Sequence, residues 1–380
     1  MQRTIRLELH PTKEQADVLF QTLEQHTACF NAVAAHGWQE GIKNGVQLHK
    51  DTYSQLRERF PRLPSQLVCA ARVKATEAVA SALALTKGKK VSGPKSKNCP
   101  IRYDARSYRV LREEQLVSLA TLAGRQKVAF GLYDHARKAM ESALSFHSAD
   151  VICRDGRWFL HLVVTLPEPV FESSGEVVGC DFGITRPAVA SNNRFYGEKR
   201  WKNIERRYFK HKRALQSKGT KSARRHLKRL RRKVKRFRID CDHVVSKRLV
   251  QNTSSGSVIV VENLTEIRQR MKARKGSALK RQMHQWSFAR LRALMEYKAQ
   301  AKGIVVVGVD PRHTSQACCH CGFKHRFNRK SQSLFHCREC GFELNADLNA
   351  SRNIAQKYLA ALGKSEGSGV ASITLLSGSY

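Results

Sequence analysis

Two closely spaced pairs of cysteines constrain the fold of this chain more than any other feature of its sequence. The four residues are Cys318, Cys321, Cys337 and Cys340. Each pair reads Cys-x-x-Cys, residues 322–336 separate the pairs, and Gly322 and Gly341 follow them, where a tight knuckle needs a permissive backbone. Two such pairs at this spacing predict a ribbon folded around one Zn²⁺ ion. Because four thiolates fill a tetrahedral coordination shell, we expect this zinc to be structural and not catalytic.

The other seven of the 11 cysteines are scattered along the chain. They are Cys29, Cys69, Cys99, Cys153, Cys180, Cys241 and Cys319. Scattered thiols favour a reducing compartment with one metal site over a disulfide framework. Cys319 lies beside the first pair but lacks the two-residue spacing to Cys321, so it is not counted as a ligand. The simpler alternative is that the two pairs arose by chance.

The charge of the chain restricts its partners. Lys and Arg total 69, Asp and Glu total 31, and the 380 residues carry a net charge of +38 at pH 7. A folded protein this basic repels itself unless a polyanion neutralises it, so nucleic acid is the expected partner and salt should weaken binding. An acidic membrane surface is the alternative. We expect no membrane association, because the sequence shows no lipidation signal, secretory signal or apolar run of membrane-spanning length.

A run of cations between residues 224 and 238 lies within a predicted basic helical region over 199–251. The residues expected to contact nucleic acid are Arg224, Arg225, Lys228, Arg229, Arg232, Lys235 and Arg236. Like charges four residues apart destabilise a helix without a counter-charge, which favours a polyanion partner over a merely solvated face. Apolar residues recur in the same run at helical spacing. We expect these residues to face the core: Leu227, Leu230, Val234 and Phe237.

The hydrophobic pattern divides the chain into two halves. In the first, a strand over residues 3–9 precedes helical patterns up to residue 35 and over 64–85, and short strands follow from 107 to 167. Asp155-Gly156 separates two alternating runs and predicts a tight hairpin. We therefore expect a small β-barrel interrupted by helices. In the second half strands alternate with helices, so the predicted fold class is multidomain α+β with an α/β second part.

Three acidic residues stand at the ends of apolar segments in the second half. Asp181 follows the strand 177–180, Glu262 follows the strand 258–261, and Asp347 opens a helix. A buried acid costs free energy unless a cation neutralises it, and strand ends converge on one edge of an α/β sheet. Carboxylates are Mg²⁺ ligands, and two such ions can clamp a phosphodiester for hydrolysis. The simpler alternative is that each acid only forms a turn or caps a helix.

Several short motifs occur in a fixed order in this second half. They are Val-Gly-Cys-Asp-Phe-Gly at 178–183, Val-Val-Glu-Asn-Leu at 260–264, Trp-Ser-Phe at 286–288, Thr-Ser-Gln-Ala-Cys at 314–318 and Asn-Ala-Asp-Leu-Asn-Ala at 345–350. In this order they resemble the TnpB family of transposon-encoded, RNA-guided DNA endonucleases, which is related to compact type V CRISPR effectors. The resemblance covers the second half closely, whereas the first half matches in organisation alone.

The resemblance implies a set of domains. A wedge-like β-barrel would comprise residues 1–10 and 101–170, and a helical recognition domain residues 11–100. A RuvC-like, RNase H-type nuclease domain would comprise 175–311 and 345–362, interrupted by the zinc ribbon at 312–344. Residues 363–380 would form a disordered tail. Asp181, Glu262 and Asp347 match the catalytic acids of the family, and the four cysteines of the two pairs match its zinc ligands.

The resemblance also implies an activity. A noncoding guide RNA from the transposon end would pair with one strand of a target double-stranded DNA, and the protein would read only a short adjacent motif. Two Mg²⁺ ions at the acids would support phosphodiester hydrolysis on both strands. The expected assembly is a monomer or a dimer on one RNA, in the bacterial cytoplasm near the nucleoid.

Two other functions share parts of this pattern. A nuclease-inactive, RNA-guided regulator would keep the basic residues but lose at least one acid, whereas all three are present. An RNase H-like transposase would use a similar acidic triad without RNA and would join DNA ends. The sequence also departs from the family pattern at Cys180, where an aliphatic residue is common, and at Thr185-Arg186, which replaces a common Lys/Asn pair. Neither change touches an expected metal ligand.

Overall fold

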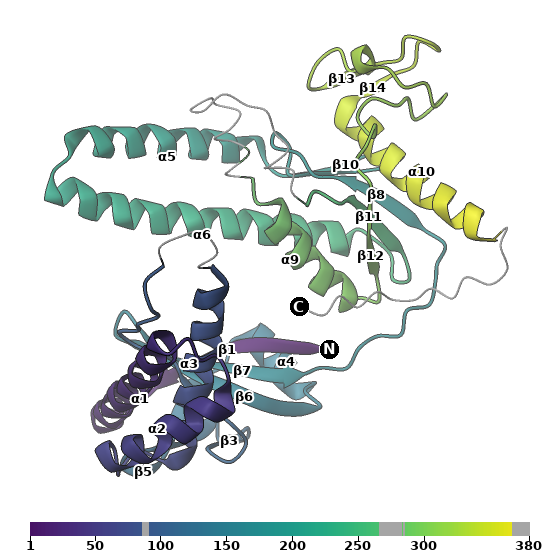
Figure 1. Cartoon of the computed structure of the whole chain (residues 1–380). Coiled ribbons are helices and arrows are strands. Elements are labelled where there is room, and N and C mark those ends of the chain that lie inside the picture. The colour runs from purple at the N-terminus through teal and green to yellow at the C-terminus, as the bar shows by residue number, and fades with distance from the viewer. Residues whose placement is uncertain (86–90, 266–282, 284–285, 367–380) are drawn as a thin grey trace. The chain divides into compact units, whose positions relative to one another are not determined.

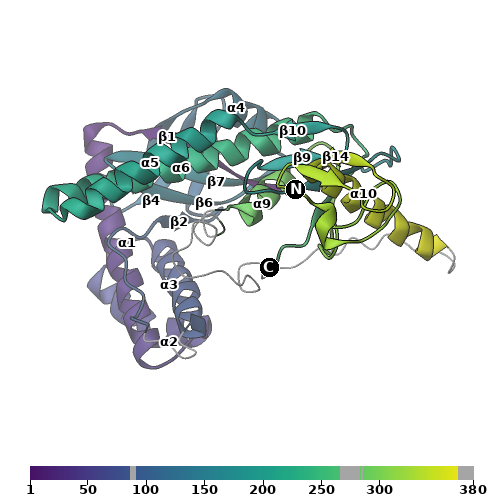
Figure 2. The same ribbon diagram turned by 90° about the horizontal axis from the view of Figure 1, so that it is seen from above.

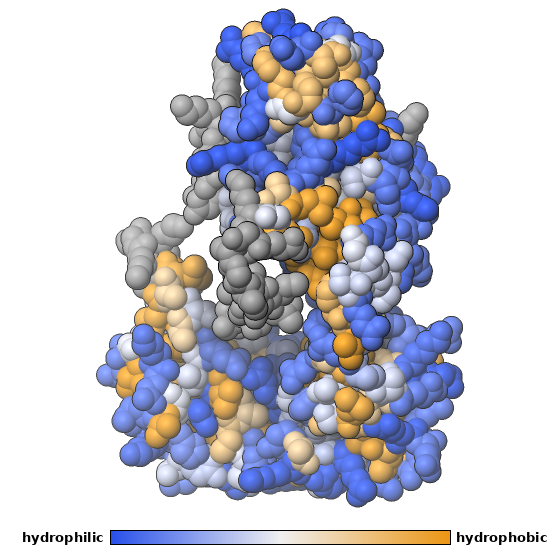
Figure 3. Space-filling view, turned by 90° about the vertical axis from the view of Figure 1, so that its right-hand side faces the viewer, coloured by the Kyte–Doolittle hydropathy of each residue, from blue (hydrophilic) through white to orange (hydrophobic). Residues whose placement is uncertain are grey.

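The computed structural model describes residues 1–85, 91–265, 283 and 286–366, and the chain divides into two compact units, Met1–Pro167 and Glu168–Tyr380 (Figure 1). Within these described ranges, no helix is both long and apolar enough to cross a lipid bilayer. Hydrophilic residues cover most of the face drawn in Figure 3, as a chain with a net charge of +38 requires.

The first unit is built on a seven-stranded antiparallel sheet in the order β2-β6-β7-β1-β5-β4-β3. Its strands are β1 (Gln2–His10), β2 (Ile101–Tyr103), β3 (Tyr108–Leu111), β4 (Leu116–Thr121), β5 (Gly124–Gly131), β6 (Ser145–Arg154) and β7 (Arg157–Thr165). Two tyrosines join opposite ends of this order: the Tyr103 hydroxyl donates to the Ala120 carbonyl at 3.1 Å, and the Tyr108 hydroxyl donates to the His147 carbonyl. The sheet is therefore curled and nearly closed.

Three helices are inserted between β1 and β2, and a fourth follows β5. They are α1 (Lys13–Gln39), α2 (Gly45–Arg59), α3 (Ser65–Leu85) and α4 (Asp134–Glu141). Thr12 and Gln15 form a capping box that fixes the start of α1. The pattern did not predict α2, which buries only Leu48, Thr52 and Leu56, one residue per turn. Figure 2 shows α1 and α3 side by side, and their buried faces share one core with the sheet.

The predicted hairpin in the first unit is confirmed. Strands β6 and β7 pair up to Arg154 opposite Arg157, and Asp155 and Gly156 between them have φ of 52° and 78°. Both positive values are those of a two-residue turn that matches the strand twist, and only Gly, Asn or Asp adopt them at low cost. On β1, Ile5, Leu7 and Leu9 are buried while the residues between them are not, as the alternation predicted.

The second unit contains a five-stranded sheet in the order β10-β9-β8-β11-β12. Its strands are β8 (Val177–Asp181), β9 (Ala188–Ala190), β10 (Arg194–Tyr196), β11 (Val258–Glu262) and β12 (Val305–Val309). Strands β8, β11 and β12 are parallel, whereas β9 and β10 run antiparallel to their neighbours. The four helices of this unit within the described ranges are α5 (Lys199–Lys218), α6 (Lys221–Gln251), α9 (Phe288–Gln300) and α10 (Ala346–Glu366).

Helices cover both faces of this sheet. Val245, Leu249 and Met295 from α6 and α9 pack with the apolar side chains of β8 and β11 in one core. Helix α10 lies on the other side in Figure 1, and it approaches β8 closely at Gly179, where an added Cβ would lie 2.0 Å from the carbonyl oxygen of Ser351. Only glycine permits this contact, which sets the position of α10 on the sheet.

The predicted basic helical region over 199–251 is two antiparallel helices, α5 and α6, which lie side by side in Figures 1 and 2. Gly219 ends α5 with φ of 63°, and the Thr220 hydroxyl caps α6. The expectation that the apolar stripe of α6 faces the core is wrong. The half-buried side chains of this stripe pack toward α5, because the hairpin needs its own apolar seam: Leu227, Leu230, Val234 and Phe237.

The cysteine-rich segment precedes α10. It contains a 3₁₀ turn (Arg326–Asn328) and a small hairpin of β13 (Leu334–His336) and β14 (Glu343–Asn345). The Asn345 side chain accepts hydrogen bonds from the backbone N–H groups of Asp347 and Leu348, so it caps α10. Helix α10 continues to Glu366, four residues into the segment predicted to be a disordered tail. The rest of that segment lies outside the described residues.

His26 makes the stability of the first unit depend on pH. It is fully buried on α1, and burial, assisted by the charge of Lys74, lowers its pKa from 6.5 to about 3. His26 therefore stays neutral in the folded state at pH values where it takes up a proton in the unfolded state. Its contribution to the free energy of unfolding is fully present above pH 6.5 and is lost as the pH falls toward 3. Linkage predicts a loss of about 2 kcal/mol between pH 7 and pH 5.

Urea unfolding followed by tryptophan fluorescence at several pH values measures this loss. His26→Gln should flatten the acid slope, whatever its effect on stability at pH 7. His10→Gln removes an exposed histidine of the same unit and should keep the slope. An unchanged slope in His26→Gln would assign the acid sensitivity to other groups.

Candidate active site and metal centre

Two of the three predicted acids lie at adjacent strand ends. Asp181 is the last residue of β8 and Glu262 the last residue of β11. These strands are parallel, and Cys180 pairs with Val261, so the two acids occupy the same edge of the sheet. Asp347 lies in the first turn of α10, where the positive end of the helix dipole favours a carboxylate. Because α10 packs on β8, Asp347 lies near enough to Asp181 for their charges to interact.

The surroundings of Asp181 and Glu262 disfavour the ionisation of these two acids. Burial and, to a smaller extent, the negative charges of Glu262 and Asp347 raise the pKa of Asp181 to about 8, against the opposing charge of Arg329. Burial also raises the pKa of Glu262, against a hydrogen bond from Thr314 and the charge of Lys357. Such a group of acids holds its full negative charge at neutral pH only beside added positive charge.

The donor set therefore fits a hard divalent cation such as Mg²⁺, which prefers carboxylate oxygens. The fit is looser than at the cysteines. Within the described parts of the chain, the four cysteines are the one group of three or more metal-binding side chains whose ligand atoms all lie within 4.8 Å of one another. The three acids interact over longer distances.

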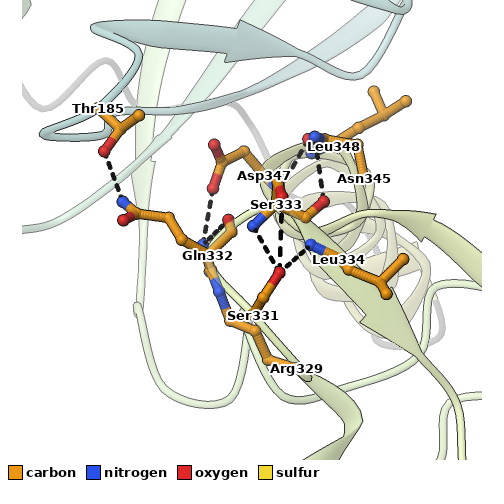
Figure 4. A network of polar contacts seen from close by, with 9 residues as sticks. All are labelled: Thr185, Arg329, Ser331, Gln332, Ser333, Leu334, Asn345, Asp347 and Leu348. Carbon is orange, nitrogen blue, oxygen red and sulfur yellow. Dashed lines mark hydrogen bonds and ion pairs between the residues drawn. The ribbon is translucent and has the colours of Figure 1, made fainter.

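Arg329 of the cysteine-rich segment also belongs to this site (Figure 4). Its Nη2 donates to Asp347 Oδ1 at 2.8 Å and to the Gln332 carbonyl at 2.9 Å. The Gln332 amide in turn donates to Thr185 Oγ1 at 2.6 Å, in the loop after β8. The loop 329–332 thus extends from α10 to the segment that follows Asp181. The sequence analysis missed Arg329, since it is one of 69 Lys and Arg residues and its partner is 18 positions away.

The two cysteine pairs come together as their spacing predicted. Cys318 Sγ lies 3.8 Å from Cys340 Sγ, and Cys321 Sγ lies 3.6 Å from Cys337 Sγ. Tetrahedral Zn–S bonds of about 2.3 Å place sulfurs about 3.8 Å apart, so the group fits one zinc ion. Gly322 and Gly341 have φ of 79° and 70°, as the knuckles require.

The cysteine group is tied to the helix that carries Asp347. Cys319 is not a member of the group, and its backbone N–H donates to the side chain of Asn349 on α10. Phe335 is fully buried beside Cys318, Cys337 and Ala346 in a small core. The ribbon therefore forms a compact body anchored on α10.

The predicted nucleic-acid contacts of α6 are all exposed. They are Arg224, Arg225, Lys228, Arg229, Arg232, Lys235 and Arg236. The apolar stripe of the same helix is turned toward α5, and Lys235 also lines the pocket that this stripe forms there. Contact with nucleic acid stays a prediction.

Comparison with known proteins adds family relationships to this geometry. The family described as "Probable transposase" matches residues 161–268, and the "Cas12f1-like, TNB domain" family matches residues 288–354. The chain is 39% identical over 131 residues to the "CRISPR-associated endodeoxyribonuclease Cas12f1" of Sulfoacidibacillus thermotolerans, covering 34% of this chain and 29% of that protein. It is 33% identical over 116 residues to a TnpB-like protein of Methanocaldococcus jannaschii, covering 30% and 41%.

A longer match is to the "Putative RNA-guided DNA endonuclease InsQ" of Escherichia coli K12, at 28% identity over 218 residues and 52% and 53% coverage. These matches span about half of each relative or less. The solved structure of a Cas12f1–sgRNA–target DNA complex shares the fold, with a TM-score of 0.64, 17% identity and coverage of 90% of this chain and 83% of that one. The resemblance drawn from the ordered motifs is thus confirmed: over part of its length the chain is similar to TnpB-like proteins and to Cas12f endonucleases.

Proposed function

We propose that this protein is an RNA-guided DNA endonuclease whose single active site comprises Asp181, Glu262 and Asp347. The observation that supports it most is the convergence of these acids at one sheet edge, with the pKa of Asp181 raised to about 8. Burying three carboxylates together is costly for stability alone, and strongly shifted pKa values mark functional sites. Two similar proteins are named as a CRISPR-associated endodeoxyribonuclease and a putative RNA-guided DNA endonuclease, and these names are the basis for proposing DNA cleavage and a guide RNA.

In this proposal each residue has a defined task. The acids would hold two Mg²⁺ ions, and these ions would supply the positive charge needed to activate a water molecule and to stabilise the leaving oxygen. Arg329 already contacts Asp347, so its guanidinium lies within reach of a phosphate held at the acids. There it would neutralise one phosphate oxygen and orient the diester. Burial around Asp181 keeps bulk water from screening these charges.

The binding of RNA and DNA is assigned to the charged surfaces. The exposed cations of α6 would contact phosphates of the guide RNA or of its hybrid with DNA, which fixes position without reading sequence. Sequence would be read by base pairing of the guide to one DNA strand, after the protein has read a short adjacent motif. Much of the net charge of +38 would be neutralised in the complex.

The domain proposal follows the same relationship. The nearly closed sheet of the first unit would act as the wedge-like barrel, with α1, α2 and α3 as the recognition domain. Residues 175–311 and 345–362, with the five-stranded sheet and α5, α6, α9 and α10, would be the RuvC-like nuclease domain, interrupted by the zinc ribbon at 312–344. A soluble bacterial complex near the nucleoid, as a monomer or dimer on one RNA, completes the proposal.

The decisive experiment is co-expression of the protein with its downstream genomic flank. RNA that co-purifies is sequenced, and the complex is then tested with Mg²⁺ on DNA that carries the guide match beside a randomised flank. Guide-dependent cleavage supports the proposal and reveals the adjacent motif. RNA-dependent binding without cleavage would indicate a regulator, and absence of RNA would indicate a transposase.

Asp181→Asn tests the acidic site. It should slow guide-dependent cleavage at least about a thousandfold, because several kcal/mol of transition-state stabilisation by bound metal are lost. RNA content should not change, since none of the seven exposed α6 cations is among the charges that shift the pKa of Asp181. Asp240→Asn removes an exposed acid of the same unit and should cleave normally. Retained cleavage by Asp181→Asn would exclude this residue from catalysis.

Cys337→Ser tests the cysteine group. Bound zinc, measured by plasma emission spectrometry, should fall from about one ion per chain to near zero, and the melting temperature should drop because metal binding and local folding are coupled. Cys319→Ser changes the neighbouring thiol outside the group and should keep the ion. If Cys337→Ser binds as much zinc as the unchanged protein, the four cysteines are not its site.

A further inference from the structure

A buried hydroxyl holds one of the three acids. Thr314 is only 2% exposed, and its Oγ1 lies 2.5 Å from Oε1 of Glu262. Oγ1 also lies 2.9 Å from the Pro311 carbonyl oxygen, but a hydroxyl has one proton to donate. The Glu262 carboxylate is the stronger acceptor of the two, because it can carry a negative charge. Thr314 therefore donates to Glu262 when that acid is ionised.

Thr314 is itself fixed by the helix that carries Asp347. The Asn353 side chain donates from Nδ2 to the carbonyl oxygens of both Thr314 and Ala317, each at 2.8 Å. Asn349 adds a second bond to the Ala317 carbonyl at 2.8 Å. Both asparagines are buried on α10, so each amide that lost its backbone partner would be costly. The segment 314–317 is thus held at a set distance from Asp347.

We propose that Thr314 is a positioning residue for Glu262. By engaging Oε1, its hydroxyl fixes the rotation of the carboxylate and leaves Oε2 as the oxygen that binds a divalent cation. Within the described ranges Oε2 makes no hydrogen bond, so this oxygen is available to a cation while Oε1 is held by Thr314. Asn349 and Asn353 fix the position of Thr314 relative to α10, so the orientation of Glu262 is linked to the helix that carries Asp347. The inference rests on the proposed metal-dependent nuclease function.

The alternative is that Thr314 only shapes the turn before the cysteine pair. A turn role would depend on the fold of the segment and not on a hydroxyl donor. A positioning role depends on the donor, and hydrogen-bond partners of metal ligands typically contribute 10- to 100-fold to metal affinity or activity. Variants that differ in the donor but not in size separate the two.

The test uses the purified RNA complex and single-turnover cleavage across Mg²⁺ concentrations. Thr314→Val keeps the shape without the hydroxyl and should cleave about 10- to 100-fold more slowly at limiting Mg²⁺, with part of the loss recovered at high Mg²⁺. Thr314→Ser restores the donor and should return to within about threefold of the unchanged protein. Ser315→Ala, which removes the adjacent hydroxyl, should behave like the unchanged protein. RNA and zinc content are measured on every variant.

A binding measurement without catalysis completes the test. Mn²⁺ bound by each complex is counted by electron paramagnetic resonance, and the signal of the Asp181→Asn complex is subtracted to remove ions held by RNA. Thr314→Val should weaken the remaining Mn²⁺ binding by about tenfold, and Thr314→Ser should not. If Thr314→Val loses zinc or RNA, Thr314→Cys, whose thiol is a weak donor, replaces it and should lie between Ser and Val.

The outcomes distinguish this inference from the proposed function. Normal Mg²⁺ dependence and Mn²⁺ binding in Thr314→Val would overturn the positioning role while cleavage by the unchanged protein upholds the nuclease. Equal losses in Thr314→Ser and Thr314→Val would also overturn it, because the donor would then not matter. A complex that never cleaves, yet shows Mn²⁺ binding that depends on Asp181 and on the Thr314 hydroxyl, would keep the inference and reject the nuclease.

Discussion

The contact between α10 and β8 at Gly179 determines how the second unit works. The backbone of Ser351 and Ala355 lies so close to this residue that a side chain would displace the helix. This close packing brings the first turn of α10, with Asp347, to the end of β8, where Asp181 lies. Parallel pairing of β8 with β11 then adds Glu262. A methyl group at position 179 would push α10 away from β8 and so change the distances between the acids, on which a shared cation site depends.

The charges of the second unit are divided between its surface and the edge of its sheet. The surplus of cations lies outside, on exposed surfaces such as that of α6, whereas three acids are gathered inside at one sheet edge. In the proposed function, the cations would attract nucleic acid at long range, and the acids would need metal ions to act on its phosphates. Arg329 and Lys357 are cations placed near these acids, and Arg329 contacts Asp347 directly. Its pairing with Asp347 reduces the repulsion that raises the pKa of Asp181.

Much of this arrangement could be predicted from local patterns. The hairpin at Asp155-Gly156, the alternation on β1 and the spacing of the cysteines are each set by neighbours in the chain, so their physical causes are visible in the sequence. Helix α2 was missed because it buries one residue per turn. The side of α6 that is covered was misjudged because its partner is α5 and not the sheet core. Periodicity shows that a face is buried but not what buries it.

In the candidate site, too, the sequence does not reveal contacts between residues that are far apart in the chain. The three acids were identified by their position after apolar segments, but Thr314 and Arg329 have no local signal, because their partners lie 52 and 18 residues away. Both belong to the segment that the cysteines fold, and they contact different acids, Glu262 and Asp347. A ribbon that served only local stability would have no reason to place a donor on each of two acids of the proposed active site. In that proposal its zinc would affect catalysis without touching substrate, since it would shape the segment 312–344 that carries both donors.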